Sequence, residues 1–320
     1  MTLPAEAPDL PFGAVEIDLH VHTLASACGY MSAEEVVAIA RAHGRKVIAV
    51  TDHDTTAGAV AVRDYAASTG DDLLVLVGME LSTSDAGHVL VFGEGVESDW
   101  GWRRGQSTPR HLPDRWIAIK AHPFRDVVKL APPGPIVDAL PDLPPSIHAV
   151  ERWNGNDLLV KAPDRRADLD VASLAYIASR GKVAVAASDA HRSISLHAYH
   201  TVFPNAVSSV NDVVDQIQAG IVRPSALPDL ELLSRRVAWR RRRIVGWYVD
   251  RQDWRRNAAA VGYDEADAAS TVAYFTAIRG LAQTEASVAD VIRDSGLYPE
   301  TALDYLAIVR EESLDTSRVR

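Results

Sequence analysis

The chain has almost no cysteine and no long hydrophobic run. Its 320 residues include one cysteine, Cys28, which excludes an internal disulfide framework and favours a reducing cytoplasm. No apolar stretch approaches the ~20 residues that a membrane-spanning helix needs, and the amino-terminus lacks the basic and then apolar layout of a signal peptide. We therefore expect a cytoplasmic protein without a membrane partner.

Basic residues are also scarce relative to acidic ones. The chain carries 43 Asp and Glu against 33 Lys and Arg, a formal net charge of −10. This excess of negative charge argues against general nucleic-acid binding by the whole molecule. Hydrophobic residues make up 47% of the chain, as in an ordinary globular protein, and the length is sufficient to bury a substantial core.

Strand-like and helical patterns alternate along residues 15–219. The strand-like runs are 15–21, 47–50, 73–79, 89–92, 116–120, 147–150, 183–186 and 199–203. The helical patterns are 33–43, 57–68, 164–180 and 210–219. Strands that alternate with helices predict parallel strands joined by helical crossovers, in either a barrel or a doubly wound sheet.

His20 and His22 close the first strand-like run. Because residues i and i+2 of a strand point to the same face, two imidazoles lie side by side there, which suits one half of a metal site. Later runs are flanked by further ligand-type residues: His53, Glu80, His88, His122, Asp189 and His191. In an α/β barrel the carboxyl ends of the strands converge on one mouth, so we expect these side chains to meet.

This set of residues is too large for one ion. Six imidazoles and two carboxylates suit two or three divalent metals with a bridging carboxylate. A single histidine at a strand end is more often a hydrogen-bonded loop residue, and His88, which opens its strand, fits that description when taken alone. A coincidence of eight such residues is far rarer, so the set as a whole predicts a metal centre.

Five short motifs carry these residues. They are Asp18-Leu19-His20-Val21-His22-Thr23, Thr51-Asp52-His53-Asp54, Gly78-Met79-Glu80, Ala121-His122-Pro123 and Ser188-Asp189-Ala190-His191. In these motifs and their order, residues 15–220 resemble the PHP (polymerase and histidinol phosphatase) superfamily. The resemblance implies a distorted (β/α)7 barrel, a site for two or three zinc, manganese or iron ions, and hydrolysis of phosphoesters, since the family includes histidinol-phosphate and nucleotide phosphatases and exonuclease-like polymerase domains.

The same resemblance assigns the ligands. One metal would take His20, His22, Glu80 and Asp189, a second would take Glu80 as a bridge with His88 and His122, and a third would use His53 and His191. Many members of the family place an Asp five residues, or a His six residues, after the second histidine, where this chain has Ala27 and Cys28. A Cys28 thiolate would suit zinc; the alternative is a small loop residue beside a weakened or empty third site.

Such a site implies hydrolysis by a metal-bound hydroxide. Two metals lower the pKa of a water between them towards about 7 and neutralise charge on the phosphoryl oxygens. Arg125 and Arg192 each closely follow a ligand histidine, and either guanidinium could grip a phosphate or form a surface ion pair. Asp52 could orient the neighbouring imidazole or simply form a turn.

We expect a phosphomonoesterase that acts on a small phosphorylated metabolite or nucleotide. The loop 93–113 carries tryptophans and arginines that could bind a flat phosphorylated group, or form an interface or a lid. One alternative is a phosphodiesterase or nuclease. Another is a scaffold or a hydrolase of non-phosphate substrates, for which Lys120 would be the nearest candidate for a carboxylated lysine bridge.

The alternation of strands and helices stops near residue 224. We therefore divide the chain into a metallophosphoesterase domain, residues 1–224, and an all-helical extension, residues 225–320. Its first part, residues 229–256, interleaves arginines with Trp and Tyr. That segment could hold nucleic acid, but we favour packing on a neighbouring domain or homo-oligomerisation.

Overall fold

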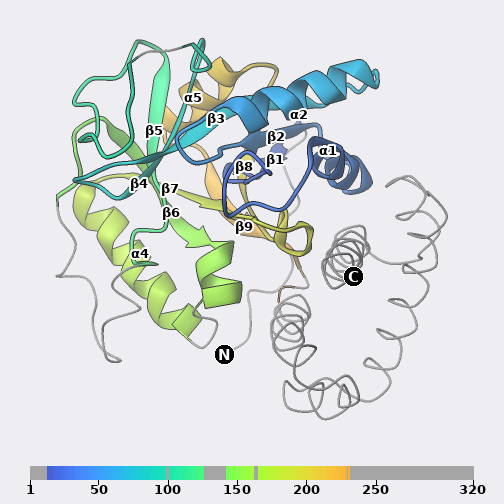
Figure 1. Ribbon diagram of the computed structural model, residues 1–320. Helices are drawn as coiled ribbons and strands as arrows, with labels where there is room; N and C mark the ends of the chain where they lie inside the picture. Colours follow the sequence, from blue (N-terminus) through green and yellow to red (C-terminus); the bar gives the residue numbers. More distant parts are fainter. Residues whose placement is uncertain (1–12, 99–100, 126–141, 162–164, 229, 231–320) are drawn as a thin grey trace, which may run out of the picture. The chain divides into compact units, whose positions relative to one another are not determined.

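The structure is a computed structural model (Figure 1), and it describes residues 13–98, 101–125, 142–161, 165–228 and 230. Contacts divide the chain into two compact units, residues 1–191 with 196–228, and residues 192–195 with 229–320. Apart from residues 225–228 and 230, the predicted helical extension and its basic segment 229–256 lie outside the described residues.

The strands of the first unit form two sheets. One sheet has the order β2-β3-β4-β5-β6-β7 and the other has the order β1-β8-β9. The bounds are β1 Val15–Ile17, β2 Val47–Val50, β3 Leu74–Ser82, β4 His88–Gly93, β5 Trp116–Lys120, β6 Ile147–Asn154, β7 Val183–Ala187, β8 Tyr199–Phe203 and β9 Arg223–Ala226. Each predicted strand is present, and the additional strand β9 crosses the predicted boundary after residue 224.

The strand directions are mixed. β2 pairs in parallel with β3, and β5, β6 and β7 pair in parallel in turn. β4 is antiparallel to both of its neighbours, and β8 is antiparallel to β1 and β9. The expectation of parallel strands throughout was therefore wrong. Residues 83–87 between β3 and β4 are too few for a parallel crossover, which needs a dozen residues or more.

The segment 18–22 closes the curled six-stranded sheet. On one side the N–H of Thr51, just after β2, donates to the Val21 carbonyl at 2.9 Å. On the other side the N–H of His22 donates to the carbonyl of Ala190, just after β7, at 2.9 Å. The segment thus fills the gap between the two edge strands, and the predicted distorted α/β barrel is confirmed.

The helices cover the outside of the barrel and one of its ends. They are α1 Ala33–Ala42, α2 Ala57–Ser68, α4 Arg166–Arg180 and α5 Val210–Gln218. α1 and α2 contact each other, and in Figure 1 they lie on the opposite side of the barrel from α4. α1 begins with the predicted capping box of Ser32 and Glu35. Within the described ranges, no helix combines the length and apolar character needed to cross a membrane.

One cluster of buried apolar residues packs side chains of the barrel strands against one another. Leu19, Leu76, Phe92 and Ile119 belong to it, as do residues on the inner face of α5. These side chains are fully or almost fully buried, and each contributes roughly 1.5–3 kcal/mol by leaving water. The apolar interior therefore holds the strands in register and leaves their ends to carry polar residues.

Candidate metal centre

The eight predicted histidine and carboxylate ligands lie together at one end of the barrel. Their side-chain nitrogen and oxygen atoms approach one another to within a few ångströms. His88 joins them although it opens its strand, because β4 runs antiparallel to β3 and pairs His88 with Ser82. The start of β4 therefore lies beside the end of β3, where Glu80 is located.

The first group of ligand atoms comes from His20, His22, Glu80 and Asp189. His20 Nε2 lies 3.1 Å from His22 Nε2 and 3.2 Å from Glu80 Oε2. Asp189 Oδ1 lies 3.4 Å from His20 Nε2 and 3.2 Å from His22 Nε2. Donor atoms bound tetrahedrally at about 2.0–2.1 Å from one zinc ion are ~3.3 Å apart. Each of the two imidazole nitrogens therefore lies at this spacing from both carboxylates, and the ligand atoms of His20, His22 and Glu80 all lie within 4.8 Å of one another.

The second group uses the other oxygen of Glu80. Glu80 Oε1 lies 2.9 Å from both His88 Nδ1 and His122 Nε2, and these two nitrogens are 3.2 Å apart. One carboxylate thus faces both groups, Oε2 towards the first and Oε1 towards the second. This is the bridging arrangement that the resemblance implied for Glu80.

A third group is formed by imidazoles alone. Ligand nitrogens of His22, His53 and His191 lie within 4.8 Å of one another, and His53 Nδ1 is also 3.0 Å from Glu80 Oε2. Cys28 is half-buried and belongs to none of the three ligand groups found among the described residues. Burial and the charges of Glu80 and Asp189 raise the pKa of its thiol. Its role as a third-site ligand stays a prediction.

Two buried carboxylate oxygens show that these residues fit metal ions. Glu80 Oε2 and Asp189 Oδ1 are buried and accept no hydrogen bond of good geometry. A buried carboxylate oxygen without a donor is costly, and its charge is normally compensated by a pairing group or a metal. Both atoms point into the first ligand group, so a cation placed there would satisfy them.

The ligands affect one another's protonation. Burial lowers the pKa of the His20 imidazole, but the charges of Asp189 and Glu80 outweigh this effect and hold the pKa well above its usual value. Burial raises the pKa of Glu80, yet the neighbouring His20 keeps it well below the usual range. Burial lowers the pKa of His53 and of His191 to about 4. The carboxylates thus favour a proton on His20, whereas burial favours neutral imidazoles at His53 and His191.

Glu151 supports the ligands from behind. Its Oε1 pairs with His20 Nδ1 at 2.9 Å, and its Oε2 accepts the His122 backbone N–H and the Asn154 side-chain N–H, both at 2.8 Å. His122 has a φ of 26°, which residues other than glycine rarely adopt. The hydrogen bond from its backbone N–H to Glu151 stabilises that conformation. This role was not predicted; the signal in the sequence is that Glu151, like the ligands, lies near a strand end.

Asp52 acts on the ligands through Ser26. Its carboxylate accepts hydrogen bonds from the Thr23 N–H, the Thr23 hydroxyl and the Ser26 hydroxyl at 2.6–2.8 Å. Ser26 Oγ in turn lies 3.2 Å from His22 Nδ1 and accepts the His53 N–H at 2.9 Å. Asp52 was predicted among the catalytic residues; in this structure it is fully buried and positions two imidazoles.

The two arginines predicted to grip phosphate differ in placement. Arg125 donates from Nε to Asp157 at 2.7 Å and from Nη2 to Asn154 at 3.2 Å, and it also pairs with Asp189 Oδ2. Its guanidinium therefore fixes the Asp189 carboxylate while Oδ1 stays directed at the histidines. Arg192 is grouped with the second unit, so its contact with phosphate stays a prediction.

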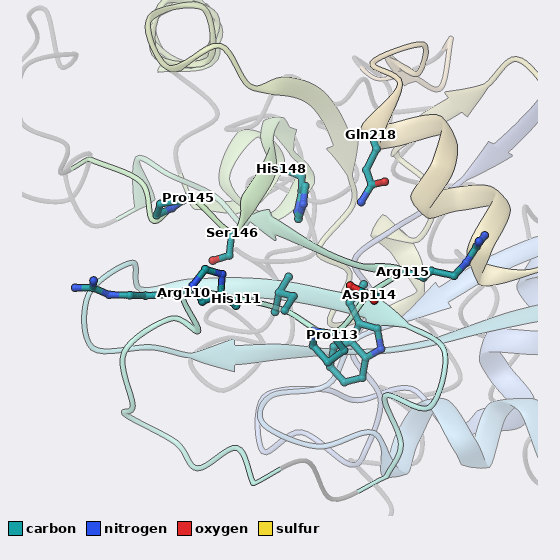
Figure 2. A pocket seen from close by; sticks show the side chains of 11 residues that line it. Arg110, His111, Pro113, Asp114, Arg115, Pro145, Ser146, His148 and Gln218 are labelled. Carbon is teal, nitrogen blue, oxygen red and sulfur yellow. The ribbon is translucent and has the colours of Figure 1, made fainter.

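A separate cavity of about 370 Å3 lies at the other end of the barrel (Figure 2). It is lined by residues from the starts of β5 and β6, including Trp116, Ser146 and His148, and by Gln218 at the end of α5. The ligand His122 follows the opposite end of β5. The cavity is therefore distinct from the metal centre.

Comparison with known families agrees with the ligand cluster. The family model of the PHP domain matches residues 18–191, more than half of the chain. The chain belongs to the PHP domain family. A second model, described as PHP-associated, matches residues 172–222. Together with the ligand cluster, membership of this family identifies a metal-dependent hydrolase.

Several solved structures are similar to the chain at low sequence identity. PsfC from Pseudomonas syringae PB-5123 is 15% identical, with 72% of this chain and 99% of that chain covered and a TM-score of 0.49. A proposed metal-dependent phosphoesterase from Bifidobacterium adolescentis ATCC 15703 is 18% identical, with 67% and 98% covered and a TM-score of 0.38. An amidohydrolase from Chromobacterium violaceum, with bound sulfate and no metal, is 16% identical, with 67% and 92% covered and a TM-score of 0.37. No curated protein matches.

Proposed function

We propose that this member of the PHP family hydrolyses phosphate monoesters of a small metabolite or nucleotide with two or three bound zinc, manganese or iron ions. The observation that carries the proposal is Glu80, whose two oxygens each face a separate group of imidazoles. A carboxylate shared in this way is typical of two-metal sites, which serve in phosphatases and nucleases.

Divalent metals, when bound, lower the pKa of a coordinated water and offset the charge of a phosphoryl group. The protein's part is to hold the ligands in a fixed arrangement. Glu151 orients His20, Ser26 links Asp52 to His22, and Arg125 directs the Asp189 carboxylate. We propose Arg192 as the guanidinium for the phosphoryl oxygens, because it directly follows His191.

The hydrogen bonds of Lys120 disfavour a metal centre bridged by a carboxylated lysine. Its Nζ donates to the Ala121 carbonyl at 2.8 Å and to the His88 carbonyl at 3.3 Å. The bridging position is taken by Glu80, so a site of the lysine-bridged amidohydrolase kind is disfavoured.

Elemental analysis combined with phosphate release tests the proposal. We expect two or more equivalents of zinc, manganese or iron per chain, and turnover of monoesters that stops when a chelator removes the metal. Cleavage of diesters or polynucleotides alone would instead favour the nuclease, with residues 229–256 as its candidate nucleic-acid segment. Metal without phosphoester hydrolysis would favour another hydrolytic substrate or a scaffold. Protein that binds no metal would contradict the proposal as a whole.

A further inference from the structure

A loop of residues 101–106 is attached to the rim of the metal centre. The Gly105 N–H donates to the Ser82 carbonyl at 2.8 Å, and Ser82 lies two residues after the bridging Glu80. The Trp102 indole N–H donates to Asp54 Oδ1 at 3.4 Å, and Asp54 directly follows His53. The loop is therefore joined to two segments that carry metal ligands.

The same loop fixes the backbone on both sides of Arg104. The Arg103 N–H donates to Gln106 Oε1 at 3.1 Å, and the Gln106 N–H donates back to the Arg103 carbonyl at 3.2 Å. Gly105 has a φ of 81°, which glycine adopts without strain. Trp102 is only 9% exposed and packs in a core cluster. Arg104 therefore projects from a backbone that is already ordered, which lowers the entropy cost of binding a ligand.

Arg104 is exposed to solvent near Asp54, whose carboxylate accepts shorter hydrogen bonds from Ser82. Its side chain is 80% exposed, and its Nε lies 3.7 Å from Asp54 Oδ2, beyond hydrogen-bond range. Asp54 accepts much shorter hydrogen bonds from the N–H and the hydroxyl of Ser82, at 2.7 and 2.8 Å. An exposed ion pair of this kind contributes little to the stability of the fold. The guanidinium can therefore exchange it for a better anion at small cost.

We propose that Arg104 forms a subsite for a second anionic group of the substrate, a carboxylate or a phosphate attached beyond the ester that is cleaved. Asp54 binds Ser82, two residues beyond Glu80 on β3, which corresponds to about 7 Å along the strand. Because Asp54 also directly follows the ligand His53, Arg104 lies close to two ligand-bearing segments without being one of the predicted ligands. The substrate class is thus a phosphate ester with a further negative charge. This inference rests on the proposed function.

The test compares two substrates that differ in one charge. 4-Carboxyphenyl phosphate carries the extra carboxylate, and 4-carbamoylphenyl phosphate is its neutral isostere. The variants are Arg104→Gln and a control, Arg110→Gln, which changes another exposed arginine between β4 and β5 that lines the cavity at the far end of the barrel. We expect Arg104→Gln to lower the preference for the carboxylate about tenfold, mainly through KM, as for loss of a charge-assisted hydrogen bond. Arg110→Gln should keep the wild-type preference. Equal preference in wild type and Arg104→Gln would overturn the subsite.

A binding measurement separates failure of the subsite from failure of the proposed function. 4-Carboxyphenylphosphonate, a non-hydrolysable analogue of the carboxylate substrate, is titrated calorimetrically into the metal-loaded wild type and both variants. If no phosphate ester is turned over, weaker binding by Arg104→Gln alone would still support the anion subsite. Equal binding by all three proteins would refute it. The metal content of each protein, measured in parallel, shows that the metal centre is intact.

Discussion

At the scale of single residues, Glu80 has the largest expected effect. Replacing it by Gln removes the charge that both ligand groups share and leaves at most one oxygen for them. We expect loss of metal from both groups and an activity loss of about a thousandfold or more, since the metals supply several kcal/mol of transition-state stabilisation. Elemental analysis and circular dichroism measure metal content and folding. The exposed Glu97→Gln is the control, and metal retained in Glu80→Gln would contradict the bridging role.

Glu151 provides a second residue-scale prediction because it contacts the ligands without belonging to a ligand group. A Gln at this position keeps one acceptor oxygen and loses the negative charge that pairs with His20 Nδ1. Such supporting partners typically contribute 10- to 100-fold in metal affinity, so we expect a loss of about that size. Competition with a chelator measures it, with the exposed Glu94→Gln as control. Unchanged affinity in Glu151→Gln would show that His20 does not need this partner.

Some of the residues in the metal centre could be predicted from the sequence and others could not. The ligand positions could be predicted, because histidines and acids at strand ends are unusual in a core and converge in a barrel. The partners of Arg125 and Glu151 could not. Arg125 pairs with Asp189 across 64 residues and Glu151 with His20 across 131. Contacts of that kind depend on how distant strands are placed in the barrel, and no local spacing encodes them.

At the scale of elements, strand direction was the feature that the pattern did not reveal. β4 is a continuously buried apolar run like β5, which is the pattern of a parallel strand, so its direction is indicated only by the length of its connections. Residues 83–87 are short enough to have indicated a hairpin. The bounds of α1 were more accessible, since Ser32, Glu35 and Gly44 mark the ends of this helix directly.

The first turn of α2 gives an element-scale prediction. Gly58 is buried there, and a Cβ at this position would overlap the carboxylate of Asp52 and the hydroxyl of Thr23. Replacing a helical Gly by Ala normally stabilises a protein by about 0.5–1 kcal/mol. Here we expect the opposite sign, together with weaker metal binding, because Asp52 holds the Ser26 hydroxyl that contacts His22.

Denaturant unfolding of Gly58→Ala decides this sign. Ala61→Gly, at an exposed position of the same helix, calibrates the helix-propensity term and should cost about 1 kcal/mol. If Gly58→Ala raised the free energy of unfolding with metal affinity unchanged, the close approach of α2 to Asp52 would have no part in positioning the ligands.

At the scale of the whole molecule, metal binding and folding are linked to pH. The raised pKa of His20 means that the metal-free protein holds a proton there at neutral pH, whereas a ligand imidazole must be neutral. Metal binding at pH 7 should therefore release protons, and the metal affinity should fall as the pH is lowered. Calorimetry in buffers of different ionisation enthalpy measures the release. A binding enthalpy that does not depend on the buffer would exclude a protonated His20.

The proton on His20 gives the metal-free and the metal-loaded protein opposite trends in Tm between pH 7 and 9. A raised histidine pKa stabilises the fold below the unfolded value of about 6.5, and this stability is lost as the pH rises through the folded value. The lowered pKa values of His53 and His191, about 4, act below pH 6.5 and add no slope in this window. We therefore expect the Tm of chelator-treated protein to fall from pH 7 to 9, while the Tm of metal-loaded protein rises because metal binds more tightly. Thermal unfolding of both forms measures this, and parallel curves would mean that the histidines and carboxylates at the barrel mouth are not where metal is bound.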